Sequence, residues 1–236
     1  MDRGILSIVA TPIGNLEDIT LRALRVLKEA DYVLCEDTRV TGKLLKHYDI
    51  RAKLKRYDAH ASDSAHEAIL NDLKEGKHIA LVSDAGTPGV SDPGVFLVAR
   101  VRREAPDTRI DAIPGASALT AAFSIAGITG NEFVFLGFVP QKKGRETFFK
   151  SLSSYEIPVI FYESPHRIMK TLESLVEHLN PRTVLGKLPE DGPRVTIARE
   201  LTKMHEEVVQ GTPEEVFQYF TDHPDHVRGE FVVMVV

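Results

Sequence analysis

The sequence predicts an α/β fold with two domains, which we place at residues 1–113 and 114–236. In the first part, short apolar strands alternate with helical segments, as in βαβ units with a mostly parallel sheet. In the second part several strands follow one another without helices, which favours antiparallel pairs in a mixed sheet. The turn Pro114-Gly115-Ala116-Ser117 lies at the boundary. With 236 residues, 43% of them hydrophobic, the chain can supply a core to each domain.

The first domain is expected to contain five strands joined by helices. Leu21, Leu24 and Leu27 have the spacing of a buried helix face. Ser64 followed by Glu67 predicts a capping box, and Gly76 ends the helix that follows it. The expected strands are 5–10, 32–35, 53–57, 78–82 and 109–113, and the expected helices are 20–29, 36–47, the segment that ends at 76, and 95–104.

The second domain is expected to begin with a helix of small residues and to continue with a mixed sheet. The expected helices are 118–126, 146–152, 168–179 and 213–220. The expected strands are 133–137, 159–162, 194–199, 206–210 and 230–236.

Composition excludes several classes of function. Cys35 is the single cysteine, so we expect no disulfide and no cysteine-based metal site, and its place in an apolar strand predicts a packing role. The histidines lack metal-ligand spacing, so we expect no metal. A formal charge of -5 argues against bulk electrostatic coating of nucleic acid. Without an apolar run of membrane-spanning length or a signal-peptide pattern, we expect a soluble, cytoplasmic protein with no membrane partner.

The loop at residues 81–94 is the most informative segment of the chain. An apolar strand runs into Gly86, Gly89 and Gly94, which suit positive φ or close approach to a ligand. Asp84 and Asp92 follow the strand on its carboxyl side, the edge at which open α/β sheets receive ligands. The loop therefore predicts a cofactor site, while the alternative is a surface turn whose aspartates cap their own backbone.

Six segments in this order resemble one family. They are residues 9–16, 36–39, 81–94, 161–167, 198–203 and 229–233. Together they are similar to ribosomal RNA small-subunit methyltransferase I enzymes, within the tetrapyrrole-methylase class of S-adenosylmethionine-dependent methyltransferases. The chain departs from the family pattern at Gln210, where we expect a basic residue, and relatives often carry a further C-terminal extension beyond the position of Val236.

The resemblance implies a two-domain, homodimeric methyltransferase that holds S-adenosylmethionine in the cleft between its domains. It implies 2′-O-methylation of a cytidine ribose in small-subunit ribosomal RNA, free or in the assembled small subunit. The cofactor-binding residues that it implies are Pro12, Gly14, Asp84, Thr87, Ser117, Ala118, Tyr162, Leu201 and Phe231. For each of them an ordinary structural role, such as a turn or a core aromatic, is the alternative.

Transfer of a methyl group to a ribose hydroxyl needs alignment, exclusion of water and an acceptor for the departing proton. The candidate catalytic residues are Glu36, Asp37, Glu163 and Glu200, and His166 is a further candidate base. The sequence does not rank them.

Basic residues near the motifs are candidate RNA contacts. Arg39 lies at the start of a helix, where a cation is unfavourable, so it is expected either to bind phosphate or to pair with Asp37. Arg167 follows a strand end and has the fork geometry that suits phosphate. The expected RNA-binding set is Arg39, Lys142, Lys143, Arg145, His166 and Arg167, and Lys53, Lys55 and Arg56 form a weaker second patch.

Two other functions stay open from the sequence. One is a tetrapyrrole C-methyltransferase of the same class, and the other is a non-catalytic protein that binds nucleotide or RNA. The charged segments 36–39 and 161–167 favour the RNA enzyme, because a macrocycle would require apolar walls. A dinucleotide dehydrogenase is disfavoured, since residues 11–15 lack the glycine-rich phosphate turn.

Overall fold

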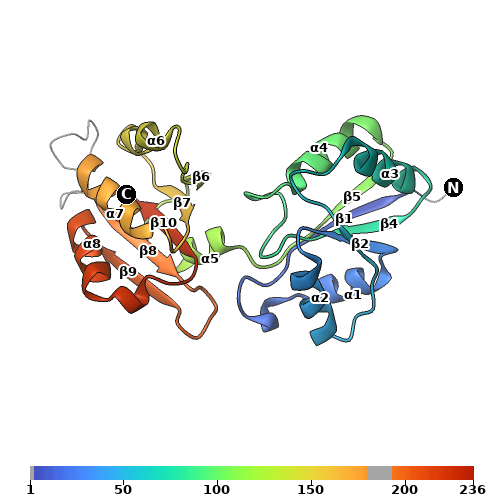
Figure 1. The fold of residues 1–236 in the computed structure, drawn as a ribbon, viewed down its shortest axis with the longest axis horizontal. Helices are drawn as coiled ribbons and strands as arrows, with labels where there is room; N and C mark the ends of the chain where they lie inside the picture. Colours follow the sequence, from blue (N-terminus) through green and yellow to red (C-terminus); the bar gives the residue numbers. More distant parts are fainter. Residues whose placement is uncertain (1–2, 180–192) are drawn as a thin grey trace. The chain divides into compact units, whose positions relative to one another are not determined.

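The structure is a computed structural model that describes residues 3–179 and 193–236. The chain forms two compact units, unit 1 at residues 1–117 and unit 2 at 118–236, and each is treated separately below. Figure 1 shows their helices and strands along the sequence. Within the described residues, no helix is both long and apolar enough to span a membrane.

Unit 1 is built on a five-stranded sheet of order β3-β2-β4-β1-β5 in which every neighbouring pair is parallel. The strands are β1 (Ile5–Val9), β2 (Tyr32–Cys35), β3 (Leu54–Arg56), β4 (His78–Leu81) and β5 (Arg109–Ile113). The helices are α1 (Leu21–Glu29), α2 (Thr38–His47), α3 (Asp63–Lys74) and α4 (Gly94–Glu104), with a short 3-10 helix at Leu16–Asp18 that the sequence did not predict. The parallel sheet predicted from the alternating pattern is confirmed.

Helices cover both faces of this sheet, with α3 and α4 on one side and α1 and α2 on the other (Figure 1). Successive residues of a strand point to opposite faces, so Tyr32 and Leu34 pack toward α3 and α4 while Val33 and Cys35 pack toward α1 and α2. Cys35 is fully buried, as its predicted packing role requires. Burial on both faces explains why β2 is apolar at every position.

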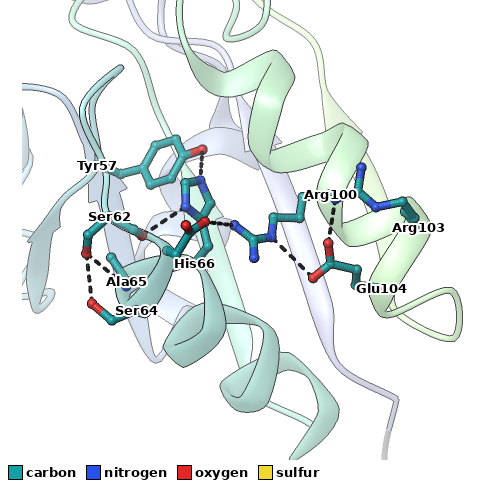
Figure 2. Close-up of polar contacts among 9 residues, drawn as sticks. Tyr57, Ser62, Ser64, Ala65, His66, Arg100, Arg103 and Glu104 are labelled. Atoms are coloured by element: carbon teal, nitrogen blue, oxygen red, sulfur yellow. Dashed lines mark hydrogen bonds and ion pairs between the residues drawn. The ribbon is translucent and has the colours of Figure 1, made fainter.

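The start of α3 corrects one local prediction. Ser62, not Ser64, is the N-cap, because its Oγ accepts from the backbone N of Ala65 at 3.2 Å. Ser64 lies inside the first turn, with its Oγ 2.9 Å from that of Ser62, so the predicted Ser64–Glu67 capping box is wrong. His66 joins Ser62 O to the Tyr57 hydroxyl at 3.0 and 3.1 Å, as Figure 2 shows.

The same corner of unit 1 is tied to α4 by Arg100. Its guanidinium contacts Asp63 at 2.8 Å. It also contacts Glu104 at 3.2 Å, as Figure 2 shows. Tyr57 is buried and directly follows β3, so these contacts hold the loop after β3 between α3 and α4.

Unit 2 contains a mixed five-stranded sheet of order β6-β7-β10-β8-β9. The strands are β6 (Val134–Phe138), β7 (Val159–Glu163), β8 (Val195–Arg199), β9 (Glu207–Gly211) and β10 (Phe231–Val235). Only the β6–β7 pair is parallel, and the consecutive strands β8 and β9 are antiparallel, as their spacing predicted. The helices are α5 (Ala118–Ile125), α6 (Arg145–Leu152), α7 (Ile168–His178) and α8 (Pro213–Asp222), with a second 3-10 helix at Pro224–His226.

The main core of unit 2 lies between one face of this sheet and helices α6, α7 and α8. Phe161, Ile197 and Val233 come from the sheet, and Phe149 and Phe220 come from two of the helices. α8 begins with a complete capping box, in which Thr212 and Glu215 exchange hydrogen bonds with each other's backbone N–H.

Candidate functional site

The carboxyl edge of the unit 1 sheet gathers the loops that carry most of the predicted cofactor residues. Because all five strands run in the same direction, the segments after β1, β2, β4 and β5 leave the sheet at this one edge. They contain Pro12 and Gly14, Glu36 and Asp37, residues 82–93, and the turn 114–117. We refer to these segments as the carboxyl-edge site.

Backbone contacts join the loops after β1 and β4. Thr11 and Gly86 form an isolated antiparallel bridge, with N···O distances of 2.9 and 3.1 Å. The Thr11 hydroxyl also donates to Ser83 O at 3.2 Å. Gly86 has φ +80°, and a Cβ there would lie 3.3 Å from Ile13 Cγ2, so the bridge requires glycine.

The turn after β5 completes this arrangement. Thr87, a predicted cofactor residue, donates its hydroxyl to Ala116 O at 3.1 Å. Gly115 lies so close to Ala10 that an added Cβ would be 2.9 Å from the alanine Cβ. The turn that contains Ser117 is therefore held beside both the first loop and the β4 loop.

Acidic side chains line the part of the site that follows β2 and β4. Asp84 Oδ1 accepts from the backbone N of Asp37 at 3.1 Å. Burial, together with the charges of Asp84 and Asp92, raises the pKa of the half-buried Glu36 carboxyl. The charges of the two aspartates thus add to the effect of burial at Glu36.

Asp92 and Asp37 each have a structural task as well. Both oxygens of Asp92 accept backbone N–H groups, from Gly89 and Gly94 at 2.7 Å each, so Asp92 shapes its own loop. Asp37 caps α2 and forms an ion pair with the exposed Arg39 at 2.6 Å, which holds the pKa of Asp37 well below its usual range. The surface pair between Asp37 and Arg39, one of two outcomes expected from the sequence, is present.

In unit 2, three predicted cofactor residues differ in their surroundings. Tyr162 accepts a hydrogen bond at its hydroxyl from the backbone N of Leu119, beside Ala118 at the start of α5. Leu201 is buried directly after β8. Phe231 is only 1% exposed, and its ring packs against Phe220 in the core.

The side chain of Phe231, which the resemblance places at the adenine end of the cofactor, is buried in unit 2. Strand alternation places Phe231, Val233 and Val235 on the helix-covered face of β10, so the Phe231 side chain lies in the core. Phe231 thus has the packing of a core aromatic, and its contact with the cofactor stays a prediction.

Glu163 lies in a buried ion-pair cluster. Its Oε1 contacts Arg167 at 2.7 Å and the backbone N of Ser164 at 2.7 Å. Its Oε2 accepts from the Thr171 hydroxyl at 2.7 Å and lies 3.5 Å from Arg145. With Glu163 1% exposed and both oxygens in use, this carboxylate is placed to organise unit 2 rather than to receive a proton from a substrate.

Two arginines that were predicted to bind phosphate belong to this same cluster. Arg167 also donates to Val139 O at 3.0 Å, so its fork is directed into the protein. Arg145 opens α6, is 8% exposed, donates to Thr171 at 2.9 Å and lies over the Phe149 ring. If either arginine turned to contact a phosphate, the buried negative charge of Glu163 would lose one of its positive partners. No sequence pattern indicated a role for Thr171, which lies eight residues after Glu163 and one helix turn into α7.

Glu200 lies at the end of β8, in the loop that leads to β9. It pairs with Lys203 at 2.8 Å, and its φ of 49° marks a tight turn. Gly229 packs against it so closely that an added Cβ would lie 1.9 Å from Glu200 Oε1. Glu200 and the segment before β10 are thus held together at one edge of the unit 2 sheet.

The other predicted RNA contacts are exposed. Lys142 and Lys143 lie in the loop before α6, and His166 lies in the turn before α7. Among the residues that the structure describes, no group of three histidine, cysteine or acidic side chains is arranged to hold a metal ion.

Comparison with known proteins gives a consistent result. Residues 6–216 match the family model described as Tetrapyrrole (Corrin/Porphyrin) Methylases. A protein of Halalkalibacterium halodurans named Ribosomal RNA small subunit methyltransferase I is 43% identical over 99% of this chain and 76% of its own length. A protein of the same name from Thermotoga maritima is 44% identical over 92% of both chains.

Solved structures with the same fold are more distant in sequence. A cobalt precorrin-4 methyltransferase of cobalamin biosynthesis has a TM-score of 0.69 at 17% identity, covering 98% of this chain and 94% of its own. The uroporphyrin-III C-methyltransferase of Thermus thermophilus, solved with S-adenosylhomocysteine, has a TM-score of 0.64 at 20% identity, covering 98% and 97%. These likenesses support the α/β fold with one parallel and one mixed sheet.

Proposed function

The chain belongs to the tetrapyrrole (corrin/porphyrin) methylase family, and on that premise we propose that it transfers a methyl group from S-adenosylmethionine to small-subunit ribosomal RNA. The observation that carries this proposal is the 43% identity to a Ribosomal RNA small subunit methyltransferase I over 99% of the chain. The solved tetrapyrrole methyltransferases are 17 and 20% identical, which supports a common fold and not a common substrate.

The finer proposal is that the acceptor is the 2′-oxygen of a cytidine ribose. It rests on the motif resemblance at residues 36–39 and 161–167. The assembled small subunit and the free RNA are both candidate acceptors. We also propose that the protein is a homodimer, which sedimentation of the purified protein tests. We propose that it is located in the cytoplasm, where such a substrate is found.

The residues of the carboxyl-edge site fit the proposed methyl donor. S-adenosylmethionine carries a sulfonium and an ammonium, and it supplies an activated methyl group when bound. Asp84, Asp92 and Glu36 supply carboxyl groups at this edge, and the charges of Asp84 and Asp92 add to the effect of burial in raising the pKa of Glu36. We propose that the rest of the donor molecule is held by Pro12, Gly14, Thr87, Ser117 and Ala118. Tyr162 and Leu201 stay predicted contacts of its adenosine part.

Among the candidate bases, Glu36 has the electrostatics that proton transfer needs. Its pKa is raised, so it binds a proton more readily than an ordinary glutamate. The pKa of Asp37 is lowered by Arg39, and Glu163 is enclosed by arginines, which disfavours both as proton acceptors. We therefore propose Glu36 as the proton acceptor, with Glu200 as the candidate from unit 2.

A methyl-transfer assay with three acceptors tests the proposal. The purified protein is incubated with S-adenosylmethionine labelled in its methyl group and with a small-subunit ribosomal RNA transcript, assembled small subunits or uroporphyrinogen III. We expect label in the RNA, free or assembled, and none in the tetrapyrrole. Label in the tetrapyrrole alone would replace this proposal with the C-methyltransferase alternative, and cofactor or RNA binding without any transfer would favour the non-catalytic alternative.

A further inference from the structure

A basic surface lies beside α2, on a chain whose overall charge is negative. Between residues 43 and 56 the sequence has six lysines and arginines and one acid, Asp49, against a formal charge of -5 for the whole chain. Lys43 and Lys46 are three residues apart on α2 and therefore share a face of the helix. Arg51 follows in the loop that leads to β3. We call Lys43, Lys46 and Arg51 the basic ridge.

The basic ridge is exposed and uncompensated. All three side chains are exposed, and none of them forms an ion pair or hydrogen bond with another residue that the structure describes. By contrast, the neighbouring cations Lys55 and Arg56 are paired with Asp72 at 3.3 Å and Asp58 at 2.8 Å. The ridge thus keeps charge available for an external anion, while the weaker patch predicted from Lys53, Lys55 and Arg56 is largely neutralised.

A groove of about 860 Å³ lies along this ridge. Lys46, Asp49 and Arg51 line its rim, and its apolar surface comes from Gly42, Leu45, Ile50, Ala52 and Leu54. Helix α2 begins at the carboxyl-edge site, where Asp37 is its N-cap and pairs with Arg39, and Lys43 follows four residues after Arg39 on the same helix. A chain of anions could follow the helix from the site to the groove.

Two structural explanations cover only part of this charge. A cation in the last turn of a helix offsets the helix dipole, which accounts for Lys46 but not for Lys43 or Arg51. Charges on an edge strand prevent association with other sheets, and β3 is an edge strand, yet no member of the ridge lies on it. Electrostatic complementarity therefore favours a polyanion as the occupant.

We propose that the basic ridge binds the phosphate backbone of the RNA substrate as it leaves the carboxyl-edge site, with the groove accepting the adjoining nucleotide. This inference rests on the proposed function and identifies a second contact surface for that substrate. Phosphate contacts supply affinity independently of sequence and release counterions, so they are measurable through the salt dependence of binding.

The test compares two variants that each remove two lysines and one arginine. The ridge variant is K43A/K46A/R51A. The control variant is K28A/K74A/R102A, whose residues are exposed and lie in the last turns of α1, α3 and α4, so that it matches the charge change and includes a helix-dipole effect at least as large as that of the ridge variant. Binding of a small-subunit ribosomal RNA transcript and of assembled small subunits is measured over a range of salt, with methyl transfer and S-adenosylmethionine affinity measured in parallel.

For the ridge variant we expect RNA binding to weaken by about tenfold or more at low salt. We expect the slope of log affinity against log salt to fall by about 2, since each single-strand phosphate contact contributes about 0.7. S-adenosylmethionine affinity should be unchanged, and the loss of methyl transfer should appear in KM more than in kcat.

Equal losses in the two variants would overturn the ridge as a specific surface, and so would an unchanged ridge variant. A loss confined to assembled subunits would overturn it too, because it would indicate a protein partner. If the wild-type protein binds RNA through the ridge but transfers no methyl group, the ridge stands and the proposed function fails. If transfer occurs while the ridge variant binds normally, only the ridge fails.

Discussion

Asp84 Oδ1 accepts a hydrogen bond from the backbone N of Asp37 at 3.1 Å, so a side chain after β4 fixes the chain after β2. The same two strands are joined at their other ends, where Asp31 Oδ2 accepts from the backbone N of His78 at 2.8 Å. The two aspartates make equivalent bonds at opposite edges of one sheet. Comparing variants of the two aspartates therefore separates the structural role of Asp84 from its proposed role in binding the methyl donor.

Asp84→Ala is expected to weaken S-adenosylmethionine binding by about tenfold or more, because it removes negative charge at the proposed position of the donor's cations. Asp31→Ala is the control, since it loses a comparable bond away from the carboxyl edge. Calorimetric titration and thermal unfolding measure both variants. An Asp84→Ala protein with wild-type donor affinity would remove Asp84 from the site.

Glu36→Gln is expected to raise thermal stability at neutral pH and to leave it unchanged near about pH 4. The folded state raises the pKa of Glu36, so ionisation of this group destabilises the fold as the pH rises above the ordinary glutamate value. Glutamine keeps the hydrogen-bonding oxygen and removes that charge. Unfolding midpoints across the pH range test this, and a variant that is less stable at neutral pH would contradict it.

The same substitution tests the proposed base. Loss of a general base is expected to lower kcat by about a hundredfold or more, with little change in donor affinity. Glu200→Gln, measured in parallel, distinguishes the two candidates. Wild-type kcat in Glu36→Gln together with a large loss in Glu200→Gln would transfer the role to Glu200.

Glu163→Ala is expected to lower the free energy of unfolding by about 3–5 kcal/mol, because it leaves buried positive charge without its partner. Arg145 and Arg167 would keep hydrogen bonds to Thr171 and Val139 but lose the carboxylate. Glu146→Ala is a surface control, since Glu146 forms an exposed pair with Lys150 and should change stability little. Urea unfolding measures both, and equal small effects would show that the cluster does not stabilise unit 2.

Gly229→Ala and Gly127→Ala separate backbone strain from side-chain crowding. Both glycines have positive φ, 81° and 65°, so each alanine should cost about 1–2 kcal/mol in the backbone. At Gly229 the new Cβ would also displace the Glu200 carboxylate, whereas nothing lies within 4 Å at Gly127. Chemical denaturation should therefore show a larger loss for Gly229→Ala, and a larger loss at Gly127 would contradict this packing.

Local patterns were sufficient to predict most of the fold. Every predicted helix and strand is present, with ends displaced by one or two residues, because apolar periodicity and turn residues are local signals. The N-cap of α3 was misassigned because Ser62 and Ser64 both precede acceptable helix positions, and only the backbone geometry distinguishes them.

The site was predicted unevenly for a physical reason. Parallel strands bring Asp84, Asp37 and Thr87 to one edge whatever the details of packing, so strand order is enough to group them. The roles of Arg145 and Arg167 depend on a tertiary contact with Glu163, which no spacing along the chain specifies. The basic ridge is not evident from the sequence because its charges are distributed over a helix and a loop, and what separates them from Lys55 and Arg56 is the lack of an ion pair among the described residues.

The measurement that tests the central claim most directly is identification of the methylated nucleoside. Small-subunit ribosomal RNA is incubated with the protein and S-adenosylmethionine, digested to nucleosides and analysed by mass spectrometry, with the Asp84→Ala protein as the comparison. The account predicts 2′-O-methylcytidine as the product, formed by the wild-type protein and strongly reduced with Asp84→Ala. A methyl group on a base, or RNA that gains no methyl group at all, would contradict it.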